Sequence, residues 1–194
     1  MQDYPSLFQE ALNQSKKSKV NVDVSLPFEN KRYINEWLMY ELGPKIGEMF
    51  TQESFVKLMR QPNGATQLHL QFLPIIERLL GVKSVLTFGY VQVPNDEDIV
   101  ETFGVDTIES YKTAIQTQAA PEKLHSWITL PSGEVIDLAF MTIYGLIYNE
   151  ASLFGNLVAK MPSEFTGGMR YVPMMVGEDF LHCVAFVSEP LVTE

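Results

Sequence analysis

One histidine and one aspartate in this sequence have the types and the spacing of a proton-transferring pair. His125 and Asp137 lie on either side of Pro131-Ser132-Gly133, a segment typical of a turn between two strands. Neighbouring strands are ~4.8 Å apart, so the two side chains can come within hydrogen-bonding reach. A histidine held by a carboxylate is fixed in one tautomer and stabilised once it takes a proton, as a general base beside a nucleophile requires.

The register of this predicted hairpin decides whether the pair forms. A two-residue turn at Ser132-Gly133 puts His125 and Asp137 on opposite faces of the sheet, whereas a three-residue turn or a bulge makes them diagonal neighbours on one face. The sequence leaves both registers open. Because Asp137 lies in an apolar strand, and a buried carboxylate needs a partner, burial favours the contact.

The residues around the pair resemble two strands of a known superfamily. HSW at 125–127 and GEVID at 133–137 are similar to the paired strands of papain-like and transglutaminase-like domains. FGYV at 88–91 resembles the strand that precedes them there, and the resemblance covers roughly residues 63–140. It implies a cysteine hydrolase or acyltransferase acting on an amide or thioester of a small molecule, peptide or protein. It also implies that His125 is the general base and Asp137 its orienter.

In that superfamily the nucleophilic cysteine begins the long helix upstream of those strands. The matching position here is Ala65, so the resemblance implies that the chain as written lacks thiol chemistry there. Two explanations stay open: a naturally degenerate member, which would be a non-enzymatic binding protein on the same fold, or a cysteine replaced by alanine. Gln67 or Asn63 is a candidate oxyanion donor near the helix start, although an ordinary cap or turn also explains either residue.

Few other side chains offer reactive groups. Cys183 is the single cysteine, which excludes an intramolecular disulfide and a cysteine-rich metal site. It lies in a predicted strand, where an inert thiol is the usual outcome; the alternative is a permuted papain-like enzyme with Cys183 as nucleophile. His69 can approach the site, but a position on the helix surface is the default expectation. We expect no metal and no cofactor, because no histidine pair has a metal-ligand spacing and Gly167-Gly168 lacks the rest of a phosphate-binding motif.

The elements that must position these residues predict an α+β fold, with helices first and an antiparallel sheet after them. By the resemblance, the core at 63–194 is papain-like or transglutaminase-like, and an N-terminal helical region at 1–62 joins it in one compact domain. Pro74 predicts a kink or a junction in the long helix, and Gly43-Pro44 predicts the end of an earlier one. The predicted helices are 6–15, 30–42, 51–59, 65–80 and 107–115. The predicted strands are 84–93, 123–130, 134–140, 169–176 and 180–187, and 20–24 is a strand or an extended segment. We expect 95–101 to be a solvated acidic loop and 143–160 to be helical or mixed.

Length, charge and terminal pattern limit the class of protein. The chain has 194 residues and a formal net charge of -10, which disfavours a nucleic-acid partner and an anionic membrane surface. No segment reaches the ~18–20 apolar residues of a membrane span, and the start of the chain lacks the pattern of a secretory signal. We therefore expect a cytoplasmic location, although export as an effector without a classical signal stays open.

Overall fold

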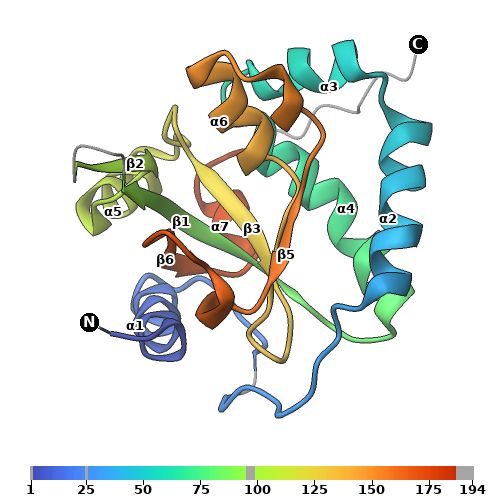
Figure 1. Ribbon diagram of the computed structural model, residues 1–194. Coiled ribbons are helices and arrows are strands. Elements are labelled where there is room, and N and C mark those ends of the chain that lie inside the picture. The colour runs from blue at the N-terminus through green and yellow to red at the C-terminus, as the bar shows by residue number, and fades with distance from the viewer. Residues whose placement is uncertain (1, 25, 95–98, 187–194) are drawn as a thin grey trace.

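The computed structural model describes residues 2–24, 26–94 and 99–186, which form an α+β fold with an antiparallel sheet at its centre (Figure 1). The α+β class predicted from the order of elements is therefore confirmed. The elements in chain order are α1 (Tyr4–Lys17), α2 (Glu36–Met49), α3 (Gln52–Met59), α4 (Gly64–Leu80), β1 (Val85–Pro94), β2 (Val100–Gly104), α5 (Ile108–Thr117), β3 (His125–Thr129), β4 (Val135–Asp137), α6 (Phe140–Tyr148), η1 (Ala151–Leu153), β5 (Val158–Lys160), η2 (Pro162–Glu164), β6 (Arg170–Val176) and α7 (Asp179–Cys183).

The sheet is organised around the long strand β1. Its strand order is β2-β1-β3-β4-β5, and β6 also pairs with β1. One half of β1 pairs with β3 and the other half with β2, so β6 occupies the opposite edge. Gly89 lies where the two halves meet, opposite His125. A Cβ at Gly89 would lie 2.1 Å from the carbonyl oxygen of Val172 and 2.8 Å from the ring of Trp127. The close approach of β6 and Trp127 to β1 at this point therefore requires glycine.

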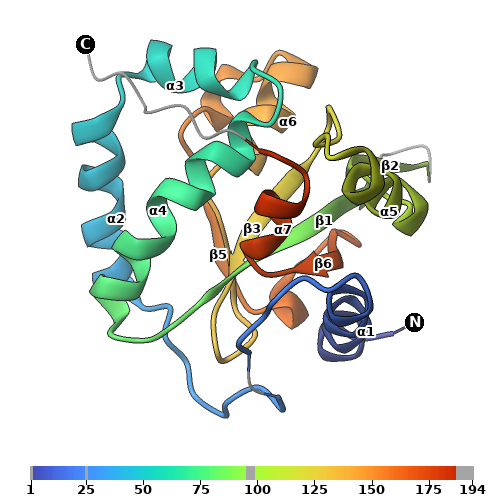
Figure 2. The ribbon, with the colours of Figure 1, turned by 180° about the vertical axis from the view of Figure 1, so that it is seen from behind.

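The core is divided between the two faces of the sheet. One cluster contains side chains of α2, α3, α4, α5 and α7, with Ile128 and Ile136 from the hairpin. The other contains Tyr4 and Phe8 of α1 together with Trp127. Figure 2 shows α4 and α7 in front of the strands, and in the opposite view of Figure 1 both helices lie behind them. Successive residues of β3 therefore contribute to opposite layers, as strand alternation requires.

Helix α4 runs unbroken over the range that the sequence predicts. It begins after Asn63, whose φ of 59° is left-handed, and it ends at Gly81 with a φ of 66°. Gly64 allows the close approach of α3, because a Cβ there would lie 2.0 Å from the carbonyl oxygen of Leu58. Pro74 lies inside the helix and does not divide it. The buried apolar face of α4 outweighs the one hydrogen bond that proline removes.

Both ends predicted for the helix at 30–42 are wrong, since α2 begins at Glu36 and extends beyond Leu42. Helix α2 continues through Gly43-Pro44 to Met49, because Leu38 and Leu42 anchor it in the core. The carbonyl that Pro44 leaves without a helical donor belongs to Tyr40, which is 75% exposed and open to water. The segment 20–24, predicted as a strand or an extended segment, pairs with no described strand, so the strand alternative does not hold.

The last predicted strand, 180–187, is also wrong. The segment from residue 180, expected as a strand to residue 187, forms the short helix α7 instead, and residue 187 lies outside the described residues. Phe180, Leu181 and Val184 are buried, which is the spacing of a helical face. A short apolar run does not distinguish a strand from a helix, and here packing against the core decided. In the loop predicted at 95–101, residues 95–98 lie outside the described residues, and Val100 begins β2, an edge strand that the sequence did not predict.

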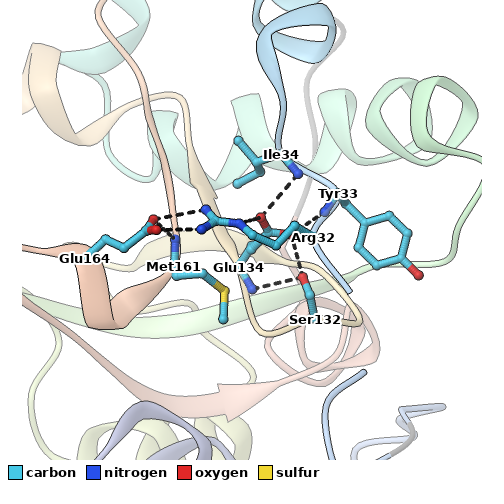
Figure 3. Close-up of polar contacts among 7 residues, drawn as sticks. All are labelled: Arg32, Tyr33, Ile34, Ser132, Glu134, Met161 and Glu164. Carbon is cyan, nitrogen blue, oxygen red and sulfur yellow. Dashed lines mark hydrogen bonds and ion pairs between the residues drawn. The ribbon is translucent and has the colours of Figure 1, made fainter. Parts of the chain in front are cut away.

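The turn of the β3–β4 hairpin is anchored to the N-terminal region through one buried carboxylate (Figure 3). Glu134 is fully buried and accepts hydrogen bonds from the backbone amide of Tyr33 (2.7 Å), from that of Ile34 (3.2 Å) and from the Ser132 hydroxyl (2.6 Å). Arg32 donates to Glu134 at 3.4 Å and also to Glu164, so it connects the turn to η2. Residues 32–34 thus hold the turn, and with it the register of the strands that carry the candidate site.

Candidate active site

The hairpin register brings His125 and Asp137 together on one face. Thr129 pairs with Val135, and the Leu130 amide donates to the Glu134 carbonyl at 2.9 Å, so three residues remain in the turn. This is the three-residue case of the two registers left open by the sequence. Gly133 closes the turn with a φ of 83°. The Nε2 of His125 lies 2.8 Å from Oδ2 of Asp137, so the predicted contact forms.

Asp137 is fully buried at the junction of β4 and α6 and has a partner for each oxygen. Its Oδ1 accepts from the backbone amides of Ala139 and Phe140, each at 2.9 Å. Its Oδ2 accepts from His125 and, at 3.0 Å, from the Tyr171 hydroxyl. Burial raises the pKa of this carboxyl, but the charge and hydrogen bond of His125 outweigh it and hold the pKa well below its usual range. Asp137 is therefore an anion over the whole neutral range.

His125 uses one ring nitrogen for Asp137 and leaves the other available. Since Nε2 faces a carboxylate, the neutral ring carries its proton on Nε2 and a lone pair on Nδ1. Within the described residues, Nδ1 makes no hydrogen bond. The side chain is 6% exposed, and the residue contributes to the wall of a cleft. This is the arrangement of a general base that is oriented from behind and reaches a ligand in front.

The start of α4 is attached to the residue that precedes His125. Leu124 donates its amide to Asn63 Oδ1 at 3.2 Å, and its carbonyl accepts from the Thr66 hydroxyl at 3.3 Å. These two bonds flank Ala65, which lies in the first turn of the helix. The backbone amide of Ala65 has no hydrogen-bond partner in the described part of the chain. A free N–H at a helix N-terminus is a donor suited to a developing oxyanion.

Ala65 and His125 line the same cleft of about 340 Å³. Its walls come from the start of α4, the end of β2, the segment before β3 and helix α6. The apolar side is formed by Phe103, Phe140 and Ile147, the last of which is 58% exposed. A cleft of the same volume lies along α1 and the hairpin turn, but His125 does not line it. Of these two clefts, only the first gives access to His125.

The other residues singled out by the sequence lie elsewhere. Gln67 is half-buried and does not line this cleft, whereas Asn63 does. Cys183 lies at the end of α7, not in a strand, and does not line the cleft either. Burial and then the Asp179 carboxylate raise the pKa of its thiol. Trp127 is fully buried and donates to the Tyr4 hydroxyl at 2.8 Å, so it packs in the core.

The surface position expected for His69 is wrong. His69 is fully buried on α4, and its Nε2 lies 3.3 Å from Oδ1 of Asp137. Helical spacing alone could have found this, since His69 follows Ala65 by one turn on a predicted apolar face. Among the described residues, the structure indicates no group of three or more His, Cys, Asp and Glu side chains arranged to hold a metal ion.

Sequence reasoning missed three residues of the site. Tyr171 comes from β6 and completes the partners of Asp137. Gly104, with a φ of 118°, approaches His125 so closely that a Cβ would lie 3.0 Å from the histidine Cβ. Gln61 lines the cleft just before the start of α4 and carries an amide donor. No local sequence signal identified Tyr171. Gly104 and Gln61 can be seen in the sequence, but nothing near them predicted that they would lie at the site.

Comparison with known proteins adds no family to this geometry. No family model, no curated protein and no solved structure matches the chain. In the described part of the chain, none of the helices combines the length and the apolar character needed to cross a membrane.

Proposed function

We propose that this protein is a papain-like domain whose cleft binds an amide or thioester group but lacks the thiol that would cleave it. The observation that carries the proposal is the 2.8 Å contact between His125 and Asp137 in the wall of the cleft that also contains Ala65. On this account His125 is the general base and Asp137 its orienter. Ala65 occupies the nucleophile position, and the ligand is a small molecule, a peptide or a protein side chain.

The division of roles follows from the two ends of the histidine ring. Asp137 holds Nε2, so Nδ1 is the atom that accepts a proton from a group in the cleft. With cysteine at position 65, Nδ1 would take the thiol proton and the thiolate would attack the carbonyl carbon. The carbonyl oxygen would then gain the negative charge, which the free amide of residue 65 and the helix N-terminus favour. An amine or thiol would leave with the proton from His125, and water would release the acyl group.

Alanine at position 65 has no thiol, so the proton transfer to Nδ1 and the attack on the carbonyl carbon cannot occur. The later steps therefore do not follow. Its methyl group extends the apolar wall formed by Phe103 and Phe140. This favours a second candidate function, a non-enzymatic interaction protein that uses the same cleft to hold a partner. The two candidates differ in whether a restored thiol produces turnover, because a cleft adapted to holding a partner has no need of an activated base.

The permuted alternative, with Cys183 as nucleophile, has less support. A nucleophilic thiol needs a lowered pKa, and burial together with Asp179 raises that of Cys183. Selective alkylation of Cys183 in the chain as written would favour the permuted enzyme over the present proposal.

The direct test restores the thiol in a chain that has no other. We expect Ala65→Cys, in a Cys183→Ser background, to react with iodoacetamide near neutral pH faster than a matched control. The control is Ala151→Cys in the same background, because Ala151 is exposed and does not line the cleft. We also expect the first variant to release thiol from simple thioesters, and His125→Gln to abolish that release. Equal alkylation rates in the two folded cysteine variants would contradict a preformed catalytic geometry.

A further inference from the structure

We propose that His69 is a positioning residue for the His125–Asp137 pair. It holds the backbone after Asp137, so that Oδ2 of the carboxylate remains available for His125. This inference rests on the proposed function, since it assigns a role in orienting the general base. His69 is fully buried, and its imidazole lies on the α4 side of Asp137.

Three consecutive backbone amides need acceptors where β4 passes into α6. They belong to Leu138, Ala139 and Phe140, and all three residues are buried. The last two donate to Oδ1 of Asp137, and the first donates to Nε2 of His69 at 2.8 Å. The histidine thus satisfies the one donor that Oδ1 does not. Without it, a buried N–H would be left unpaired or would compete for the carboxylate.

The contact with Leu138 also fixes the protonation of His69. A backbone amide can only donate, so Nε2 carries a lone pair and the ring proton lies on Nδ1. Nδ1 faces the Ser126 hydroxyl at 3.4 Å, which can accept that proton. The ring is therefore neutral, and its 3.3 Å approach to Oδ1 of Asp137 brings two acceptors together. Because His69 is neutral, His125 is the histidine that pairs with the negative charge of Asp137.

Loss of His69 should therefore affect the orientation of Asp137 as well as stability. The unpaired amide of Leu138 would turn toward the carboxylate, and Oδ2 would leave its place opposite His125. A residue that merely fills space would leave the hydrogen bond of His125 intact. The state of the His125 ring distinguishes these two roles.

The experiment is ¹⁵N NMR of the histidine rings in the chain as written, which needs no thiol. There are three histidines, and His182→Gln assigns one of them. We expect the His125 ring to be locked as the Nε2–H tautomer in the wild type and in His69→Gln. The glutamine Oε1 is as many bonds from the backbone as Nε2 and can accept from Leu138. We expect His69→Leu to lose that lock and to give a mixture of tautomers.

A folded His69→Leu with an unchanged His125 tautomer would overturn the inference. If that variant does not fold, His69→Asn replaces it, because its shorter amide falls short of Leu138 while remaining polar; an unchanged tautomer there has the same meaning. In the Ala65→Cys and Cys183→Ser background, we expect His69→Leu to slow alkylation about tenfold and His69→Gln to restore the rate. If residue 65 is not activated at all, the proposed function fails, yet the NMR result still decides the role of His69.

Discussion

Replacing Asp137 by asparagine changes the charge of the site with almost no change in shape. The amide oxygen can remain at the Oδ1 position, where it accepts from Ala139 and Phe140. The amide nitrogen then occupies the Oδ2 position and meets two donors, Nε2 of His125 and the Tyr171 hydroxyl. To avoid opposed donors, His125 must move its proton to Nδ1, the nitrogen that faces the cleft. Asp137→Asn should therefore remove the base and weaken the fold together.

The size of the stability loss follows from the bonds that change. A hydrogen bond to a charged group contributes about 1.5–3 kcal/mol, and this substitution removes two of them, from His125 and Tyr171. The two amide bonds to Oδ1 survive, and the new tautomer of His125 recovers part of the loss. We expect the free energy of unfolding at pH 7 to fall by about 3 kcal/mol.

The same carboxylate gives this loss a defined pH dependence. The unfolded pKa of an aspartate is near 3.8, and the folded pKa of Asp137 is lower. Its contribution is therefore fully present above 3.8 and disappears as the pH falls toward the folded pKa. The difference between wild type and variant should be about 1 kcal/mol smaller at pH 3 than at pH 7, because protons bind the unfolded aspartate first.

Urea denaturation followed by tryptophan fluorescence at both pH values measures these differences, since Trp127 is fully buried. Asp106→Asn is the matched control, because Asp106 is exposed and makes no contact with the site. We expect that control to stay within about 0.5 kcal/mol of the wild type. The reasoning is refuted if Asp137→Asn is as stable as the control at pH 7, or if its deficit does not depend on pH.

Substitutions at three further positions test the parts that support the site, each by urea denaturation. Asn63→Ala should cost about 2 kcal/mol and Asn63→Gly about 1, because glycine keeps the left-handed backbone and loses only the bond to Leu124; equal losses would contradict this. Glu134→Gln should cost about 2–3 kcal/mol and expose the bond after Arg32 to trypsin, and unchanged cleavage would show that the carboxylate does not hold that segment. Gly89→Ala should cost more than about 3 kcal/mol, since its Cβ would lie 2.1 Å from a carbonyl oxygen, and a mild effect would contradict the close approach of β6 to β1 at Gly89.

Local sequence patterns predicted the elements on which the site is built. The turn residues before Glu134 indicated the hairpin, and the apolar spacing after Ala65 indicated α4 with its end at Gly81. The pairing of His125 with Asp137 was predicted as one of two registers. Turn length decides between them, and turn length depends on a left-handed glycine and on the anchoring of Glu134 by distant residues.

Long-range contacts account for most of what the sequence did not reveal. Tyr171 reaches Asp137 from a strand 34 residues away, and nothing near either residue encodes that approach. Helical spacing could have indicated the burial of His69, but its contacts with Asp137 and Leu138 depend on how α4 packs on the β3–β4 hairpin. The segment containing Cys183 is apolar enough for a strand or a helix. In the helix that forms, Phe180 packs against Phe88 with ring centroids 4.9 Å apart.

The central claim is that the cleft is prepared for a nucleophile that Ala65 does not supply. The measurement that tests it most directly is the pKa of a thiol at residue 65, taken from the pH dependence of iodoacetamide alkylation in Ala65→Cys with Cys183→Ser. An ordinary cysteine has a pKa of about 8.5. The account predicts a pKa at least about one unit lower, from the helix start and His125, and a return toward the ordinary value in His125→Gln. A thiol that is folded into the cleft, titrates at the ordinary value and ignores the loss of His125 would contradict it.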